Sequence, residues 1–285
     1  MNTEKTTSAS KHFHESIPKL KDKEFNLFKD IIFQQAGISL SPLKKSLVEN
    51  RLLKRIRELN LDSYSNYHHL VMNDVNNNEM QVLIDVLTTN ETYFFRESAH
   101  FDYLKNTILN DVSRTQDFSV WSAASSTGEE PYSLAMVVAD VLGVHGRWRI
   151  TATDINSEVL KKAQSGKYML NEKDAIPNEY LRNYCLKGIR SQEGVILIDK
   201  TIRAHVHYES ANLMENWGSH IDDFDVIFIR NVMIYFNAET RKNLISRIAE
   251  RLKMGGHLFI SHSETLHNLS DRFKLVQPSV YVRIK

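Results

Sequence analysis

Two neighbouring carboxylates mark the most informative turn of the chain. A buried strand predicted at 118–124 leads into residues 125–130, which contain one glycine, Gly128, and end in Glu129 and Glu130 at the start of a helix. A dinucleotide-binding turn needs three glycines, so this turn does not predict a Rossmann NAD site. Because a helix N-terminus already attracts anions, two carboxylates there oppose a pyrophosphate and favour a ligand with a positive group. S-adenosylmethionine fits, since it carries an ammonium and a sulfonium and no phosphate, although one glutamate could simply cap the helix dipole.

Two further strands are predicted to end in polar residues. Asp154 closes the strand predicted at 149–154, where an acidic residue suits the two hydroxyls of a ribose, or caps the next helix. Arg230 and Asn231 end the next clear strand, and Tyr235 follows about one helical turn later. Because the carboxyl ends of parallel strands lie at one edge of a sheet, we expect these residues to face one ligand that contains adenosine.

An aromatic segment precedes the first strand. Asn90, Thr92 and Arg96 carry polar side chains, and positions 93–95 are all aromatic. Three exposed rings would be unusual in a linker, because contiguous apolar surface is rarely left in water. We therefore expect the rings to pack against the sheet domain and the polar groups to line a site.

The predicted elements divide the chain into two domains. Residues 1–16 are predicted to be a disordered tail, and 17–89 show only helical periodicity, which predicts a small all-helical domain. Strands and helices alternate over 90–285, which predicts a doubly wound, mostly parallel α/β sheet. Two strands at 273–284 predict an antiparallel end of this sheet. Short alternating runs at about 166–203 predict a small β-subdomain inserted in it.

Composition and charge exclude several classes of protein. The net charge of +1 over 285 residues argues against a general nucleic-acid binder. Residues 1–60 hold 12 Lys/Arg and 7 Asp/Glu, a net charge of +5 that leaves −4 for the rest of the chain, so we expect a local acidic partner surface. The single cysteine, Cys185, excludes an internal disulfide and a multi-cysteine metal site. Without an apolar run of 18 residues or a secretory signal, we expect a cytoplasmic monomer that does not insert into the membrane.

Five segments together resemble the CheR family of chemotaxis receptor methyltransferases; in chain order they are NETYFFRE, WSAASSTGEEPYSLAM, ATDI, FDVIFIRNVMIYF and GHLFISHSE. The resemblance runs from about residue 20 to the C-terminus, and the combination of 90–97 with 122–132 is highly specific. It implies a class I S-adenosylmethionine-dependent methyltransferase fold with a helical N-terminal domain and an inserted β-subdomain. It also implies methyl transfer from S-adenosylmethionine to glutamate side chains of membrane chemoreceptors, which leaves S-adenosylhomocysteine and gives glutamyl methyl esters for sensory adaptation.

The resemblance further implies roles for individual residues. Arg96 and Tyr235 are the expected catalytic residues, and no metal is expected. Asp154 would hold the ribose, and Glu129 is favoured over Glu130 as the contact of the methionine part of the cofactor, with the choice between them open. The expected cofactor-binding residues are Asn90, Thr92, Arg96, Ala123, Glu129, Asp154, Asn212, Leu213, Arg230 and Asn231. Of these, Asn212 and Leu213 would flank the adenine.

Basic residues on the helix predicted from residue 44 are candidates for binding the acidic methylation helices of receptors. The expected docking residues are Lys44, Arg51, Lys54, Arg55 and Arg57. The alternative is an ordinary solvated basic helix. The turn at 187–194 resembles a version of the inserted β-subdomain that binds a receptor C-terminal peptide by strand addition.

Two rival functions can be separated from this one. Amine methylation of nucleic acids usually shows an Asn/Asp-Pro-Pro-aromatic motif after the fourth strand, where this chain reads Arg-Asn-Val-Met from Arg230. Methylation of pyrimidine C5 requires a catalytic cysteine, and Cys185 lies in the predicted insertion instead. A sensor or scaffold that binds S-adenosylmethionine without transferring its methyl remains the alternative, which a methyl-transfer assay would distinguish.

Overall fold

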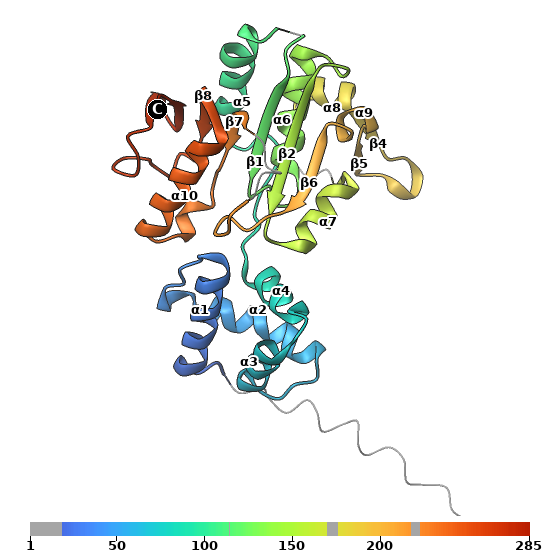
Figure 1. Cartoon of the computed structure of the whole chain (residues 1–285). Coiled ribbons are helices and arrows are strands. Elements are labelled where there is room, and N and C mark those ends of the chain that lie inside the picture. The colour runs from blue at the N-terminus through green and yellow to red at the C-terminus, as the bar shows by residue number, and fades with distance from the viewer. Residues whose placement is uncertain (1–18, 114, 170–175, 218–222) are drawn as a thin grey trace, which may run out of the picture. The chain divides into compact units, whose positions relative to one another are not determined.

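The chain folds into two units, which are described separately. The computed structural model describes residues 19–113, 115–169, 176–217 and 223–285, so the tail predicted at 1–16 lies outside the described residues. One unit is helical and contains the described residues up to Ile32 together with Leu40–Leu87. The other contains Phe33–Ser39 and Thr88–Lys285. Figure 1 shows the helices of the first unit and the sheet of the second.

The helical unit is built from amphipathic helices whose apolar stripes meet in a core. Val48, Leu52 and Ile56 recur at helical spacing and are fully buried, as the apolar periodicity predicts. Ser63 caps a helix by accepting the N–H of Asn66. The described helices here are α1 (Asp22–Ala36), the 3-10 turn η1 (Pro42–Lys44), α2 (Lys45–Glu58), α3 (Tyr64–Asn73) and α4 (Asn78–Leu87). The last residues of α1 are grouped with the second unit.

A seven-stranded sheet organises the second unit. Its strand order is β6-β2-β1-β7-β8-β10-β9, in which β6, β2, β1, β7 and β8 run parallel and β10 runs antiparallel to both of its neighbours, β8 and β9. The strands are β1 (Phe118–Ala123), β2 (Trp148–Asp154), β6 (Val206–Ser210), β7 (Phe224–Phe228), β8 (Leu252–Phe259), β9 (Phe273–Gln277) and β10 (Val280–Arg283). This arrangement confirms the predicted fold class, a mostly parallel doubly wound sheet with an antiparallel end.

Helices cover both faces of this sheet. Val120 packs with the buried residues of α6 (Glu129–Leu142). Trp121, the next residue, faces the opposite side of the sheet and packs with the buried residues of α10 (Ala238–Arg251). Because successive side chains of a strand alternate between faces, the wholly buried β1 can serve both cores. Other helical elements of this unit are α5 (Ala99–Tyr103), the π-helical turn η2 (Leu104–Ile108), the 3-10 turn η3 (Leu109–Asp111) and α7 (Ser157–Ser165).

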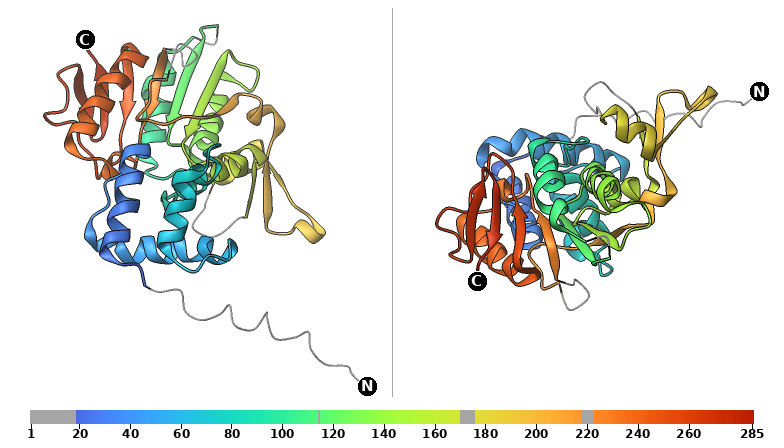
Figure 2. Two further views of the ribbon diagram at one scale, coloured as in Figure 1. Left: turned by 60° about the horizontal axis from the view of Figure 1, so that its bottom comes forward. Right: turned by 90° about the horizontal axis from the view of Figure 1, so that it is seen from above.

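The inserted subdomain contains a second, antiparallel sheet with the order β3-β5-β4. Its strands are β3 (Lys167–Met169), β4 (Cys185–Lys187) and β5 (Val195–Ile198), and it also holds α8 (Asn178–Tyr184), the 3-10 turn η4 (Arg190–Gln192) and α9 (Lys200–Arg203). Both views of Figure 2 show the β4–β5 hairpin extending away from the large sheet. The predicted β insertion is therefore present, and two short helices accompany its strands.

Candidate cofactor and active site

Four of the predicted site residues lie at the carboxyl ends of parallel strands of the second unit. Ala123 ends β1, Asp154 ends β2, and Arg230 and Asn231 follow β7. These three strands are adjacent in the sheet, so their ends share one edge. This is the edge at which open α/β sheets bind ligands.

The turn after β1 has an unusual backbone. Ala124 and Ser126 are non-glycine residues with φ of 79° and 49°, and Gly128 has φ of 96°. Such left-handed conformations persist when the surrounding structure holds them, and they gather at functional sites. Asp154 supplies one restraint, because its Oδ2 accepts the N–H of Ser126 at 2.8 Å while its Oδ1 accepts that of Asn156 at 2.9 Å. The turn and the predicted ribose carboxylate are thus joined directly.

Gly128 shows why one glycine is enough in this turn. A Cβ at this position would lie 2.6 Å from the hydroxyl of Tyr168 and 2.8 Å from both Ala163 Cβ and the Tyr208 hydroxyl. Glycine is therefore needed here so that these three side chains can pack against the turn. It is not needed to let a phosphate approach the backbone. With two carboxylates at the helix start, the turn fits S-adenosylmethionine and disfavours a nucleotide phosphate.

The two carboxylates of the turn have different surroundings. Glu130 Oε1 accepts the Ser122 hydroxyl at 2.6 Å, and Oε2 lies 3.3 Å from Nε of the buried Arg230. Burial raises the pKa of Glu130 despite the opposing effect of Arg230. Glu129 instead accepts the hydroxyl of Thr127 at 2.6 Å. Both carboxylates thus have partners inside the protein, and the choice of Glu129 as the cofactor contact stays a prediction.

Arg230 connects β7 to the aromatic segment. Its side chain is 2% exposed, its Nη2 donates to the carbonyl oxygen of Arg96 at 2.5 Å, and its guanidinium lies 5.7 Å from the ring centres of both Phe101 and Phe228. Its Nη1 lies 3.2 Å from Nδ1 of His100. Burial, together with Arg230, lowers the pKa of His100 to about 4, so the neutral ring can accept this hydrogen bond at pH 7.

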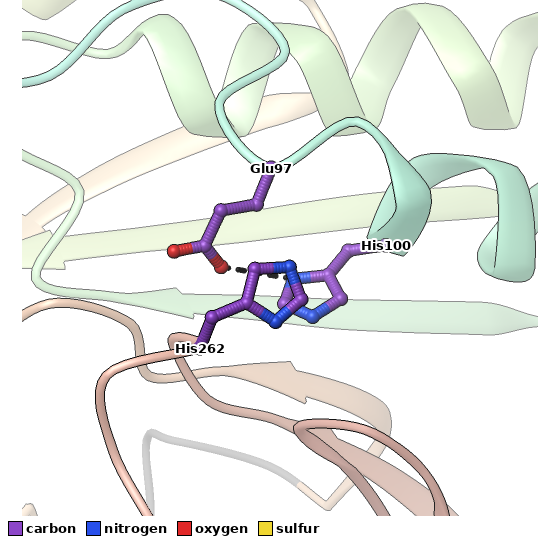
Figure 3. A group of neighbouring side chains, drawn as sticks. All are labelled: Glu97, His100 and His262. Atoms are coloured by element: carbon purple, nitrogen blue, oxygen red, sulfur yellow. Dashed lines mark ion pairs between the residues drawn. The ribbon is translucent and has the colours of Figure 1, made fainter.

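Glu97, His100 and His262 form a compact cluster, shown in Figure 3 with the 3.4 Å contact between Glu97 Oε2 and His100 Nδ1 dashed. One candidate ligand atom from each lies within 4.8 Å of the others, a spacing that resembles a metal site. The Arg230 guanidinium lies against the same groups, with Nε 3.9 Å from Glu97 Oε2. The fixed positive charge of Arg230 disfavours a metal ion at this place. A histidine that binds a metal through one ring nitrogen donates the N–H of its other nitrogen to an acceptor, whereas Nδ1 of His100 faces a donor, Nη1 of Arg230. We interpret the cluster as a hydrogen-bonding network around Arg230.

Glu264 was missed by sequence reasoning. Its carboxylate accepts the N–H groups of Ser261 at 2.9 Å, Asn231 at 3.2 Å and Met233 at 2.9 Å. These contacts hold the left-handed backbone of Asn231, which has φ of 59°. Burial raises the pKa of Glu264 although the N–H contacts oppose the shift. The only signal in the sequence is an acidic residue just after β8, within the segment GHLFISHSE.

Ser261 links this loop to the aromatic segment. Its hydroxyl accepts the side-chain amide of Asn231 at 2.7 Å and donates to Glu97 Oε1 at 2.9 Å. Burial by itself would raise the pKa of Glu97, but Arg230 and this hydroxyl outweigh it and leave the pKa lowered. The ends of β7 and β8 and the segment around Arg96 therefore form one connected polar network.

The aromatic segment combines a buried ring with an accessible cation. Phe94 is 3% exposed, and the N–H of Phe95, with φ of 54°, donates to the Ser133 hydroxyl of α6. Arg96 is half-buried; its Nη1 donates to the carbonyl of Glu91 and its guanidinium lies 5.7 Å from the ring centre of Tyr93. Asn90 touches the turn, since its carbonyl accepts the Ser126 hydroxyl at 2.8 Å. Thr92 is half-buried in the same segment.

Residues 33–39 contribute to this unit, which the sequence did not predict. The Asn212 side chain donates to the carbonyl of Gln35 at 2.7 Å, and the carbonyl of Tyr235 accepts the N–H of Ser39 at 2.8 Å. Tyr235 itself is half-buried in the 3-10 turn η5 (Met233–Tyr235), and Leu213 is buried. The predicted adenine-flanking pair and Tyr235 are thus each next to this short segment.

The predicted docking residues belong to the helical unit and divide into two groups. Arg55 donates to both carboxylate oxygens of Glu79, at 2.8 and 2.6 Å, and Arg51 donates to the carbonyl of Leu87 at 2.7 Å. These two side chains are half-buried and help to hold α2 to α4. The exposed members of the set are Lys44, Lys54 and Arg57.

The sheet order and the acidic, single-glycine turn joined to Asp154 define a class I S-adenosylmethionine-dependent methyltransferase. Comparisons with known proteins narrow this class. Residues 90–282 match the family model described as CheR methyltransferase, SAM binding domain, and residues 23–88 match CheR methyltransferase, all-alpha domain. The chain therefore belongs to the CheR family, the S-adenosylmethionine-dependent methyltransferases of chemotaxis.

The sequence similarity to individual relatives extends over nearly their whole length. The chain is 41% identical to a chemotaxis protein methyltransferase of Salmonella typhimurium, over 93% of this chain and 92% of the relative. It is 40% identical, with the same coverage, to a protein of that name from Escherichia coli, and 34% identical to one from Borreliella burgdorferi over 94% of this chain and 96% of the relative. No helix among the described residues is both long and apolar enough to cross a membrane.

Proposed function

We propose that the protein transfers the methyl group of S-adenosylmethionine to glutamate side chains of membrane chemoreceptors, in the cytoplasm and as a monomer. The observation that carries this proposal is Arg96, a half-buried cation anchored by Glu91 and Tyr93 beside the cofactor turn. The other arginine of the site, Arg230, is buried against Glu130 and the carbonyl of Arg96. Arg96 is thus suited to an incoming anion, whereas Arg230 is suited to hold the framework.

The chemistry matches this inventory of residues. A glutamate side chain has an ordinary pKa of roughly 4.3, so at pH 7 it is already a carboxylate and needs no general base. A substrate carboxylate oxygen attacks the methyl carbon, the C–O bond forms, and the C–S bond breaks with its electron pair moving to sulfur. The bound cofactor supplies the activated methyl group. The main contribution of the protein is then to align the reactants. In well-oriented reactions, alignment lowers the activation free energy by about 7–11 kcal/mol.

Three features of the chain would provide this alignment. Arg96 would hold the substrate carboxylate through paired hydrogen bonds, and Tyr235 would orient it toward the methyl carbon. Asp154 would bind the ribose and Glu129 the methionine part, with Asn90, Thr92, Ala123 and Asn231 lining the site and Asn212 and Leu213 flanking the adenine. Because opposite charges disappear in the reaction, the apolar rings at 94 and 95 would favour the transition state over the separated ions.

Receptor docking would use the exposed basic residues of η1 and α2. Lys44, Lys54 and Arg57 are exposed and would attract the acidic methylation helices, while Arg51 and Arg55 would mainly preserve the helix that presents them. The long-range part of such attraction weakens as salt is added.

The inserted subdomain would provide a second contact. β4 lies at the edge of its three-stranded sheet, with Leu186 54% exposed and Ile189, just after the strand, 72% exposed. An extended receptor peptide could add as a strand to such an edge, with its side chains on these apolar groups.

The test is transfer of labelled methyl from S-adenosylmethionine to membranes that contain chemoreceptors, followed by mild alkali. We expect label on the receptors that alkali releases as methanol, which identifies a glutamyl methyl ester. Alkali-stable label would instead identify methylation of nitrogen or carbon. Tight binding of S-adenosylhomocysteine without any transfer would overturn the proposal in favour of a sensor or scaffold.

A further inference from the structure

Tyr168 joins the inserted subdomain to the cofactor turn. It lies in β3, is 5% exposed, and donates its hydroxyl hydrogen to the carbonyl oxygen of Thr127 at 2.7 Å. Its ring packs edge-on against Phe94, with ring centres 4.9 Å apart and planes at 79°. One side chain of the insertion thus contacts both the cofactor turn and the aromatic segment.

The turn rests directly on this side chain. A Cβ at Gly128 would lie only 2.6 Å from the Tyr168 hydroxyl, so the turn needs glycine at this position while Tyr168 occupies its place. The hydrogen bond from the same hydroxyl to the carbonyl of Thr127 opposes movement of the turn away from Tyr168. Tyr168 therefore restrains the turn backbone at Thr127 and restricts the residue type at Gly128.

This restraint extends to the carboxylate of Glu129. Thr127 receives the Tyr168 hydrogen bond on its carbonyl and donates its own hydroxyl to Glu129 Oε2 at 2.6 Å. Burial raises the pKa of Tyr168 well above its usual value, so the hydroxyl keeps its proton and remains a donor at neutral pH. A shift of Thr127 would therefore move the Glu129 side chain with it.

We propose that Tyr168 is a positioning residue of the cofactor site, which acts through Thr127 on Glu129 and makes the inserted subdomain part of the cofactor-binding machinery. This inference rests on the proposed role of Glu129 as a cofactor contact. It assigns the insertion a task beyond receptor docking. Loss of the Tyr168 hydroxyl should weaken cofactor binding more than it slows the chemical step, because the substrate-facing residues Arg96 and Tyr235 do not contact it.

The experiment compares Tyr168→Phe with the matched control Tyr184→Phe. Tyr184 is also a buried tyrosine of the insertion, in α8, and it stacks on Tyr180 at 6.1 Å. Tyr168→Phe keeps the ring against Phe94 and removes only the hydroxyl. We expect the Kd for S-adenosylhomocysteine, measured by calorimetry, and the KM for S-adenosylmethionine to rise by about 3- to 10-fold, as loss of one hydrogen bond predicts. The kcat at saturating cofactor should stay within about twofold of wild type.

A second variant keeps the test decisive if Tyr168→Phe folds poorly. Thr127→Val removes the hydroxyl that contacts Glu129 and should raise the same Kd. Because both changes act through one carboxylate, the double variant should lose less affinity than the two single losses combined. Cofactor affinities equal to that of Tyr184→Phe, with only a lower melting temperature, would overturn the inference. A wild-type protein that binds S-adenosylhomocysteine but transfers no methyl would contradict the proposed function and leave this inference standing.

Discussion

An arginine–glutamate pair in each unit shows how burial changes the task of the same two side chains. In the helical unit, Arg55 makes a forked contact with Glu79 and its side chain is 24% exposed. In the second unit, Arg230 lies 3.3 Å from Glu130 and its side chain is 2% exposed. Water reaches the first pair mainly through Arg55, because the Glu79 side chain is only 11% exposed, so this pair is screened more than the second but less than a surface ion pair. The second pair is inseparable from the network around it, because an unpaired charge at that depth is strongly unfavourable.

The largest effect should follow from removing Arg230. Arg230→Met leaves Glu130 and Glu97 without their buried partner, and the free energy of unfolding should fall by about 3–5 kcal/mol. Arg55→Met, the control in the helical unit, should lower it by less, about 1–3 kcal/mol, because Arg55 is partly exposed while Glu79 is buried. Urea unfolding measures both, and combining Arg230→Met with Glu130→Gln should recover part of the loss. Equal losses at the two arginines would show that burial does not separate them.

The next largest effect concerns the accessible arginine of the site. Arg96→Ala should lower kcat by about 10²-fold, because the substrate carboxylate loses its alignment, while the fold remains stable. Arg96→Lys keeps the charge but loses the forked geometry, so an intermediate rate is expected. Methyl transfer to receptor membranes measures both variants. Near-normal turnover of Arg96→Ala would refute the proposed role of this side chain.

A smaller effect is expected from the titration of His100. Its pKa is lowered to about 4 in the folded protein, below the ordinary value of about 6.5, so the unfolded chain binds its proton first as the pH falls. Stability from this group is therefore present above pH 6.5 and lost between about 6.5 and 4, by at most about 1.4 kcal/mol per pH unit. Urea unfolding at pH 7 and pH 5 measures this loss, and it should be smaller in His100→Gln. An unchanged difference would place the acid sensitivity in other groups.

The smallest effect is expected on the exposed face of α2. Lys54→Glu with Arg57→Glu should slow receptor methylation by less than about tenfold, more at low salt than at high salt, and leave the free energy of unfolding nearly unchanged. Arg55→Glu should lower stability as well, because it places two carboxylates together at Glu79. Receptor methylation rates at two salt concentrations measure the difference. Rates unaffected by the double reversal would remove α2 from the docking surface.

Much of the fold was predictable from the sequence because the signals are local. The apolar periodicity around Val48 and Leu52 marks α2, and the run at 118–124 marks β1, whatever the rest of the chain does. The sequence does not predict strand β6 or the helices of the insertion, because β6 has buried and exposed residues in irregular order and α9 is only four residues long. Short elements are set by the surfaces they pack on rather than by their own periodicity.

The sequence by itself determined that Gly128 stands in an acidic turn, that Asp154 ends the following strand, and that both reach one edge of a parallel sheet. These conclusions need only residue types, their order and the geometry that parallel strands share. Only the tertiary structure decided that Glu130 pairs with Arg230, that Glu264 holds the loop of Asn231, and that Tyr168 supports the turn. Each of these partners lies more than thirty residues away along the chain. A hydrogen bond depends on differences of a few tenths of an ångström between donor and acceptor, which no spacing in the sequence specifies.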